Sequence, residues 1–66
     1  MRINGQQVTD KVLSELSDRK ISKTEFSRQM GFSLPTFYVR EKAHDWSIKE
    51  INLISEVFNI PINELI

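Results

Sequence analysis

Cysteine is absent from the chain, so neither a disulfide bond nor a thiolate metal site can form. The single histidine, His44, has no second histidine with which to share a metal ion. Glycine is scarce as well, and neither of the two glycines lies in a phosphate-binding loop. No serine, histidine and carboxylate follow one another in a pattern typical of a catalytic set. We therefore expect no metal, no cofactor and no enzyme activity.

Long apolar runs are also missing. A transmembrane helix needs about 18 or more consecutive apolar residues, and no segment of this chain approaches that length. The first residues, MRINGQQ, lack the basic and then apolar pattern of a signal peptide. We expect a soluble protein located in the cytoplasm. Its 66 residues are enough for one small domain.

The chain has no net charge, because nine basic and nine acidic side chains balance. Their distribution is uneven. Residues 19–44 hold six basic and two acidic side chains and carry +4, whereas the rest of the chain holds three basic and seven acidic side chains and carries −4. A positive half of this kind suits the phosphates of nucleic acid. Uneven scatter in a short chain is the alternative explanation.

The positive half contains the pattern of a short helix. Ser22 followed by Glu25 is a capping-box sequence, in which each residue's side chain satisfies a backbone N–H of the other. Phe26 and Met30 follow at helical spacing and predict an apolar face directed at a core. A helix is therefore expected to begin near Ser22 and to run to about Met30.

A turn and a second helix follow directly. Gly31 stands where a helix ends in the left-handed region, which glycine enters without a Cβ clash. Ser33 is a good N-cap, and Pro35 suits the first turn of the next helix, where its missing N–H is not needed. Two short helices joined by a glycine-containing turn predict a helix-turn-helix over residues 22–42.

Helical patterns also flank this unit. Apolar residues at helical spacing predict a first helix over about residues 6–19, preceded by a flexible arm at residues 1–7. A second capping box, Ser47 with Glu50, starts another helix, for which Asn59 is a C-cap and beyond which Pro61 forbids continuation. The apolar residues expected to face inward from it are Ile48, Ile51, Ile54, Val57 and Phe58. Residues 62–66 predict a last short turn or helix.

No segment alternates apolar and polar residues over a useful length, so no strands are expected. The predicted fold is all-α, a compact bundle of four to five short helices around a central helix-turn-helix. The domain is expected to span residues 8–66. The aromatic residues assigned to its core are Phe26, Phe32, Phe37, Trp46 and Phe58.

Residues 22–43 resemble the Cro/repressor-type (xenobiotic-response-element-like) helix-turn-helix family of phage and mobile-element regulators. The residues that fit the pattern are Ser22, Lys23, Phe26, Ser27, Met30, Gly31, Phe32, Ser33, Thr36, Phe37 and Glu41. The closing segment, residues 51–66, resembles that of the family too, so the likeness covers about residues 8–66. It implies a lambda-repressor-like fold and a transcriptional repressor whose second helix of the pair enters the major groove of double-stranded DNA.

The resemblance also implies which residues face the bases. They are Leu34, Pro35, Thr36, Tyr38 and Val39. This set is mostly apolar and lacks the bidentate hydrogen-bonding side chains that distinguish guanine or adenine. Thymine methyl groups, the hydroxyls of Thr36 and Tyr38, and DNA shape are the features left for recognition. For Leu34, partial burial in the core is an equal alternative.

Phosphate contacts are expected from the basic side chains around this helix and from the two capping serines, with help from the helix N-termini. The candidates are Ser22, Lys23, Arg28, Ser33, Arg40, Lys42 and His44. Arg40 occupies a place where relatives often carry a buried aliphatic residue. It lies either inward or across the wall of the DNA groove with its guanidinium in solvent.

Two questions about partners stay open at this stage. Leu53, Ile62 and Ile66 are hard to bury in so small a bundle and form a possible homodimer patch, suited to a palindromic operator. Packing of these residues on their own core is the alternative. The apolar residues of the second helix of the pair also suit a different function, in which the chain grips a partner repressor protein instead of DNA.

Overall fold

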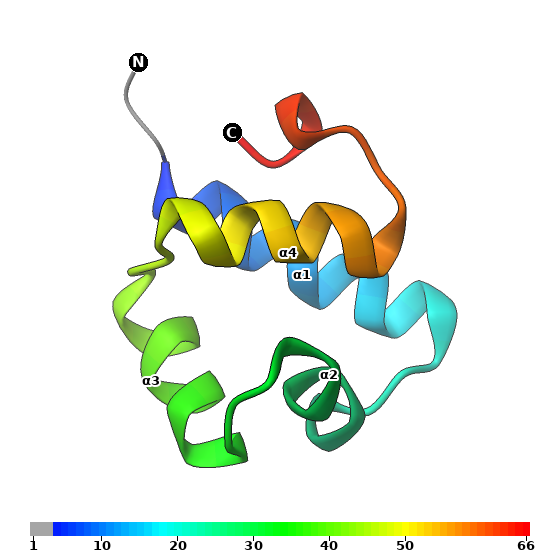
Figure 1. Cartoon of the computed structure of the whole chain (residues 1–66), viewed down its shortest axis with the longest axis vertical. Coiled ribbons are helices and arrows are strands. Elements are labelled where there is room, and N and C mark those ends of the chain that lie inside the picture. Colours follow the sequence, from blue (N-terminus) through cyan, green and yellow to red (C-terminus); the bar gives the residue numbers. More distant parts are fainter. Residues whose placement is uncertain (1–3) are drawn as a thin grey trace.

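The computed structural model describes residues 4–66, which form four α-helices and one short 3-10 helix. The α-helices are α1 (Gly5–Arg19), α2 (Lys23–Met30), α3 (Leu34–Ala43) and α4 (Ile48–Phe58), and the 3-10 helix is η1 (Ile62–Glu64). No strand occurs in this part of the chain. The prediction of an all-α bundle with a helix-turn-helix at α2 and α3 is confirmed (Figure 1).

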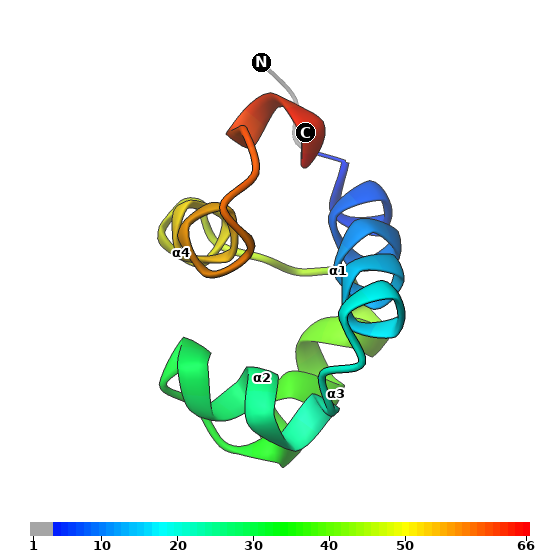
Figure 2. The same cartoon turned by 90° about the vertical axis from the view of Figure 1, so that its right-hand side faces the viewer.

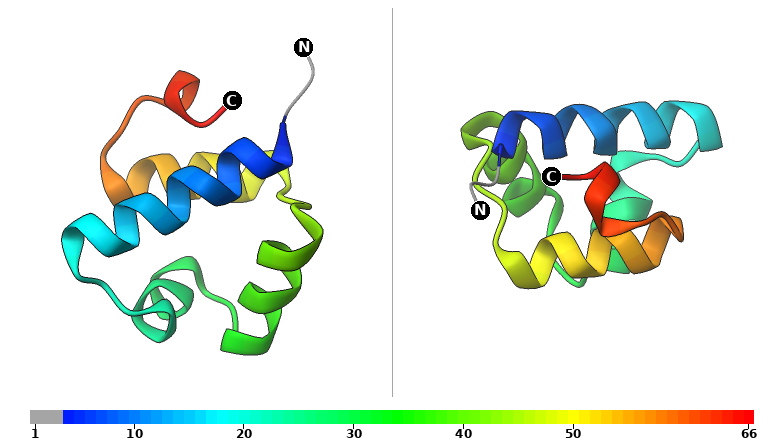
Figure 3. Two further views of the ribbon diagram at one scale, coloured as in Figure 1. Left: turned by 180° about the vertical axis from the view of Figure 1, so that it is seen from behind. Right: turned by 90° about the horizontal axis from the view of Figure 1, so that it is seen from above.

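The helices enclose a small core from several sides. Seen from the side, α1 and α4 lie opposite each other, and α2 and α3 close the space at one end (Figure 2). Seen from above, the C-terminal turn that contains η1 lies between α1 and α4 (Figure 3). The molecule measures 30 × 22 × 17 Å. In this arrangement the helix-turn-helix forms one end of the domain, and one side of it faces solvent.

Aromatic rings fill the centre of the core. The ring of Phe26 stacks on Phe58, with 5.3 Å between centroids, and meets Phe37 edge-on at 5.6 Å. Trp46 packs edge-on against Phe37 at 6.3 Å. All four are buried as predicted. Phe32 is only half-buried and lies at the margin of this cluster.

One apolar residue of α4 departs from its predicted position. Ile48 was assigned to the inward stripe, but it is 59% exposed. It is the first residue of the helix, directly after the N-cap Ser47, and lies beyond the end of the core. Ile51, Ile54 and Phe58 are buried and carry the apolar face of α4.

The start of α1 corrects the predicted arm. The helix begins at Gly5, so the segment expected to be flexible up to residue 7 is too long, and residues 1–3 lie outside the described part of the chain. Asn4 is the N-cap, and its side-chain oxygen accepts hydrogen bonds from the backbone N–H groups of Gln6 and Gln7 at 3.1 and 3.2 Å. The Asn-Gly pair therefore starts a helix here.

The other helix ends agree with their sequence signals, with one exception. Gly31 ends α2 with φ of 81°, and Ser33 caps α3. Ser47 and Glu50 form a complete capping box. At α2, Ser22 accepts a hydrogen bond from the Glu25 N–H at 3.0 Å, but the reciprocal half is not formed. The Glu25 carboxylate instead lies near the side chains of Arg28 and Gln29.

Candidate nucleic-acid interface

The outer face of α3 is largely apolar. Because Phe37 is buried under the helix, residues on its opposite side point to solvent. Tyr38 is 48% exposed and Val39 is 58% exposed, and Pro35 in the first turn is exposed as well. Leu34 is half-buried and packs on the core, as the alternative reading of that residue proposed. Of the predicted base-facing residues, three therefore lie together on the open side of α3.

Thr36 differs from these three residues because its hydroxyl already has a partner. The Oγ1 of Thr36 lies 3.0 Å from the Oγ of Ser33, and the Thr36 N–H donates to the same Ser33 oxygen at 3.4 Å. Both hydroxyls thus belong to the N-cap of α3. Ser22 uses its hydroxyl in the same way at the start of α2.

Lys23 joins α2 to α3. Its Nζ lies 3.3 Å from the carboxylate of Glu41, and the same ammonium lies 5.5 Å from the centroid of the Tyr38 ring and 6.0 Å from that of Phe37. A cation this close to aromatic faces is attracted by the ring quadrupole. Lys23, predicted as a phosphate contact, is thus held within the helix-turn-helix.

Arg40 joins α3 to α4. Its Nε donates to both carboxylate oxygens of Glu50, at 3.1 and 3.0 Å, and Glu50 also accepts a hydrogen bond from the N–H of Ser47 at 2.9 Å. The side chain of Arg40 is 31% exposed. It is therefore neither in the core nor extended into solvent, and its charge faces the first turn of α4.

Arg19 lies at the opposite end of the domain and ties α1 to α4. It donates from Nη2 to the carbonyl oxygen of Phe58 at 2.6 Å, lies 5.1 Å from the Phe58 ring centroid and pairs with Glu15 at 2.8 Å. The hydrogen bond from Arg19, with a further one from Lys11, holds the pKa of Glu15 below its ordinary value despite the opposing effect of burial. Arg28, an exposed residue of α2, pairs with Glu25 at 3.4 Å.

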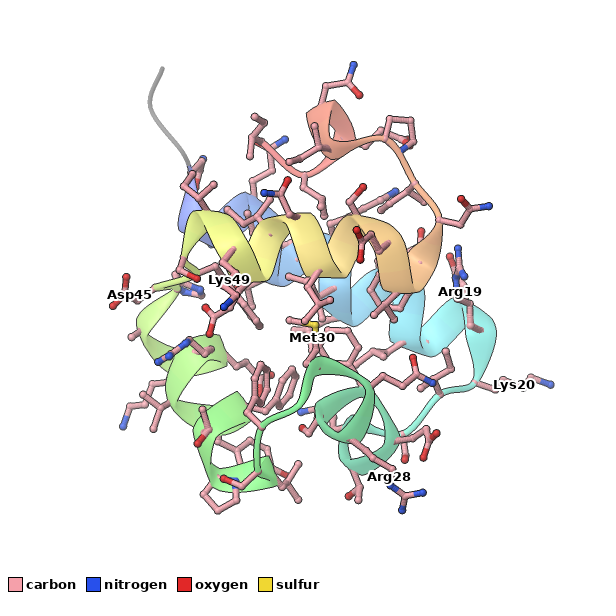
Figure 4. All side chains as sticks on the ribbon, viewed as in Figure 1. Arg19, Lys20, Arg28, Met30, Asp45 and Lys49 are labelled. Carbon is pink, nitrogen blue, oxygen red and sulfur yellow. The ribbon has the colours of Figure 1, made fainter. Side chains whose placement is uncertain are left out.

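These ion pairs change the charge of the predicted positive half. Four of its six basic side chains have a carboxylate partner, and Lys20 and Lys42 have none within residues 4–66. Lys49, in the first turn of α4, is also without a carboxylate partner there. Figure 4 shows Lys49 on the side of α4 that faces α3, and Lys20 far from α3 at the other side of the molecule. Lys49 was not among the predicted phosphate contacts, although it lies in the first turn of the helix that Ser47 caps.

His44 lies in a hydrogen-bonded junction with α1. Its Nδ1 is 3.0 Å from the hydroxyl of Thr9, which also accepts a hydrogen bond from Trp46 Nε1 at 2.8 Å. His44 ends α3 in the left-handed conformation, with φ of 55°. This side chain, predicted as a phosphate contact, helps to fix the connection between α3 and α4.

The predicted dimer residues do not form one exposed patch. Leu53 and Ile66 are half-buried and pack against the core, whereas Ile62 is 38% exposed. Leu65 is the fully buried residue of the C-terminal turn. The side chain of Gln7 reaches the carbonyl of Ile66 at 3.5 Å, which ties the end of the chain to α1.

Residues 4–66 form no pocket, and no three histidine, aspartate or glutamate side chains among them come together as a metal site would require. None of the helices described here is both long enough and apolar enough to cross a membrane. The exposed side of α3 and its surroundings are the candidate functional surface, because the residues predicted to face the bases lie there.

The sequence was also compared with known proteins. Searches of curated proteins and of solved structures gave no significant match. The family model of the Cro/C1-type helix-turn-helix DNA-binding domain matches residues 11–66, which include all of α2, α3 and α4. This match and the observed fold confirm the resemblance found in the sequence, and the chain belongs to the Cro/C1-type helix-turn-helix family of DNA-binding domains.

Proposed function

We propose that this protein is a sequence-preferring regulator of transcription that inserts α3 into the major groove of double-stranded DNA. The observation that carries this proposal is the open side of α3, presented at one end of a domain of a DNA-binding family. A helix on a rigid support is the element that a major groove admits. Occupying an operator is enough to repress transcription, so the protein acts as a repressor in the cytoplasm, associated with the nucleoid.

Phosphate contacts come chiefly from cations that have no internal partner. Lys42 extends from the last turn of α3, and Lys49 lies at the start of α4 on the side that faces α3. Ser22 and Ser33 mark helix N-termini whose backbone N–H groups favour anions. Lys23, Arg28 and Arg40 contribute less, because the carboxylate beside each of them already offsets its charge.

A selection from a random duplex library tests the proposal. The purified protein is expected to enrich a defined sequence at low salt, and a labelled duplex of that sequence is expected to bind more tightly than a scrambled one. If no member of the library is retained at low salt, the protein does not act through DNA. The symmetry of the enriched sequence gives further information, because a palindrome indicates a homodimer with its two α3 helices about 34 Å apart.

A homodimer of this kind would use the C-terminal side of the domain. Ile62 is its exposed apolar residue, whereas Leu53 and Ile66 are partly buried against the core. Sedimentation of the wild type and of Ile62→Asp is expected to show a dimer that the substitution dissociates. A wild-type monomer at the concentrations that saturate DNA would remove this part of the proposal.

A second candidate function is favoured by the same apolar surface. Pro35, Tyr38 and Val39 would also suit a partner repressor protein, because exposed aromatic and aliphatic residues are common at protein interfaces. The library selection separates the two functions. Retention of DNA supports the operator-binding function, whereas a failure with DNA together with tight binding to a purified repressor would support the other.

A further inference from the structure

The polar groups of α3 are mostly engaged inside the protein. The hydroxyl of Thr36 is bonded to Ser33, Nε of Arg40 to Glu50, and the carboxylate of Glu41 to Lys23. Within residues 4–66, the polar side-chain groups of α3 without a partner are the Tyr38 hydroxyl, the Lys42 ammonium and the two Nη groups of Arg40. Pro35, Tyr38 and Val39, the remaining exposed residues, carry no group for bidentate hydrogen bonding to a guanine or adenine edge.

The exposed side chains of α3 form one apolar surface. Pro35, Tyr38 and Val39 are three and four positions apart, so they are neighbours on the same side of the helix. Both Tyr38 and Val39 expose about half of their surface. We call these three residues the apolar face of α3.

The ring of Tyr38 is held in place by contacts with Lys23 and Phe37. The ammonium of Lys23 lies 5.5 Å from its ring centroid, and the Phe37 ring lies 6.0 Å away at an angle of 59°. Glu41 fixes the ammonium in turn at 3.3 Å. The ring of Tyr38 thus enters a complex already oriented, which lowers the entropy lost on binding.

The major groove offers one apolar feature to such a surface. Thymine carries a methyl group on C5, whereas the other base edges present hydrogen-bond donors and acceptors. A 5-methylcytosine carries its methyl group on the same ring carbon and displays it in the same groove. Contact with the apolar face removes either methyl group from water and is favourable.

We propose that the apolar face of α3 recognises the C5-methyl groups of pyrimidines, so that the protein binds thymine-containing DNA and gains affinity when cytosine is methylated. This inference rests on the proposed DNA-binding function and names the base feature that gives its sequence preference. Each methyl group buried against Pro35, Tyr38 or Val39 is expected to raise affinity about fourfold.

The test uses the full chain and the duplex obtained from the library selection. Fluorescence anisotropy is measured with this duplex, with duplexes in which deoxyuridine replaces single thymines, and with duplexes in which 5-methylcytosine replaces cytosines next to them. At one or more positions, deoxyuridine is expected to weaken binding about fourfold and 5-methylcytosine to strengthen it by a similar factor. If neither replacement changes the affinity while the unmodified duplex still binds, methyl recognition is wrong and DNA binding stands.

Two variants locate the effect in the protein. Val39→Thr keeps the shape of an exposed side chain but replaces one methyl by a hydroxyl, so the preference for thymine over uracil is expected to fall. Lys42→Met removes an unpaired cation. It is expected to weaken binding to the thymine duplex and to the deoxyuridine duplex equally, so the preference between them stays unchanged. An unchanged preference in Val39→Thr, with its helical circular dichroism intact, would place the methyl contact elsewhere. If the wild-type protein binds none of the duplexes, the proposed DNA-binding function itself is wrong.

Discussion

At the scale of single residues, Thr9 has the most connected side chain. It is 2% exposed, and its hydroxyl contacts the carbonyl of Gly5 at 3.1 Å, Nε1 of Trp46 and Nδ1 of His44. A hydroxyl has one proton to donate and two lone pairs to accept with. The carbonyl of Gly5 can only accept, so the Thr9 hydroxyl donates its proton there. The Trp46 N–H can only donate, so it takes one lone pair of the hydroxyl, and the other lone pair is used if Nδ1 of His44 carries the proton. One side chain of α1 thus fixes the connection between α3 and α4.

Thr9→Val is expected to destabilise the protein by about 1–3 kcal/mol, because it leaves the buried Trp46 N–H without a partner. Urea unfolding followed through the fluorescence of Trp46, the single tryptophan, measures the loss. Thr9→Ser is the matched control, because it keeps the hydroxyl and removes only a methyl group. Equal stability of Thr9→Val and the wild type would show that the junction contributes nothing.

Gly5→Ala is expected to destabilise the protein, although alanine is the better residue within a helix. A Cβ on Gly5 would overlap the carbonyl group of His44, which is backbone and can move only with the α3–α4 connection. The expected loss is about 1–3 kcal/mol, the range seen for overpacked sites. Gly31→Ala is a useful comparison in the same denaturation assay, because it meets no neighbouring atom and suffers only from φ of 81°. A stabilised Gly5→Ala would contradict the close approach.

At the scale of the elements, long cationic side chains connect the helices. Lys23 joins α2 to α3, Arg40 joins α3 to α4, and Arg19 joins α1 to the last turn of α4. Two of these residues were predicted to contact phosphates, because only their sequence positions were known. Their carboxylate partners lie 18 and 10 residues away, in a different helix.

Lys23→Met and Lys42→Met are expected to act differently on DNA binding. A lysine that neutralises a phosphate contributes about 0.9 to the slope of log K against log salt. Lys42→Met should therefore reduce the steepness of that slope by about 0.9, whereas Lys23→Met should leave it unchanged because Glu41 already balances its charge. Titrations at several salt concentrations give both slopes. Equal reductions would make Lys23 a phosphate contact after all.

The link between α1 and α4 also predicts a dependence on pH. The pKa of Glu15 is lowered in the folded protein by the hydrogen bond from Arg19, so its carboxylate stabilises the fold above the unfolded pKa. This stability is lost as pH falls through the lower, folded pKa. Glu15→Gln should therefore be less stable than the wild type at about pH 7, and the difference should shrink below about pH 4. Urea unfolding at both values measures it, and a difference independent of pH would assign the effect to packing.

At the scale of the whole molecule, the internal ion pairs decide how much charge is available to a partner. The chain is neutral, and the surplus of its positive half falls from +4 to +2 because Glu15 and Glu50, from outside that half, pair with Arg19 and Arg40. What remains near α3 is Lys42 and Lys49 beside an apolar face. With few free charges, short-range contacts of the apolar face should contribute more to DNA binding than long-range electrostatic attraction to the phosphates.

The salt dependence of the wild type is expected to be shallow. Two phosphate contacts, from Lys42 and Lys49, give a slope of log K against log salt of about −2, whereas five contacts would give about −4.5. Titration of the selected duplex over a range of salt concentrations measures it. A slope near the steeper value would mean that Lys23, Arg28 and Arg40 exchange their carboxylates for phosphates in the complex.

The sequence by itself determined the order of the helices and where most of them end. Ser22, Gly31, Ser33 and Asn59 act on backbone groups within a few residues of themselves, so their roles follow from local spacing. The buried aromatic residues could be predicted from helical periodicity for the same reason. These local signals were enough to identify the family and the exposed position of α3.

Only the tertiary structure decided which polar side chains are available for binding. The partners of Lys23, Arg40 and His44 lie in other helices, and no local pattern predicts such contacts. The need for glycine at residue 5 likewise comes from a carbonyl 39 positions along the chain. Packing brings these distant groups within hydrogen-bonding or contact distance. It thereby gives three predicted phosphate contacts partners in other helices and leaves the apolar face of α3 exposed.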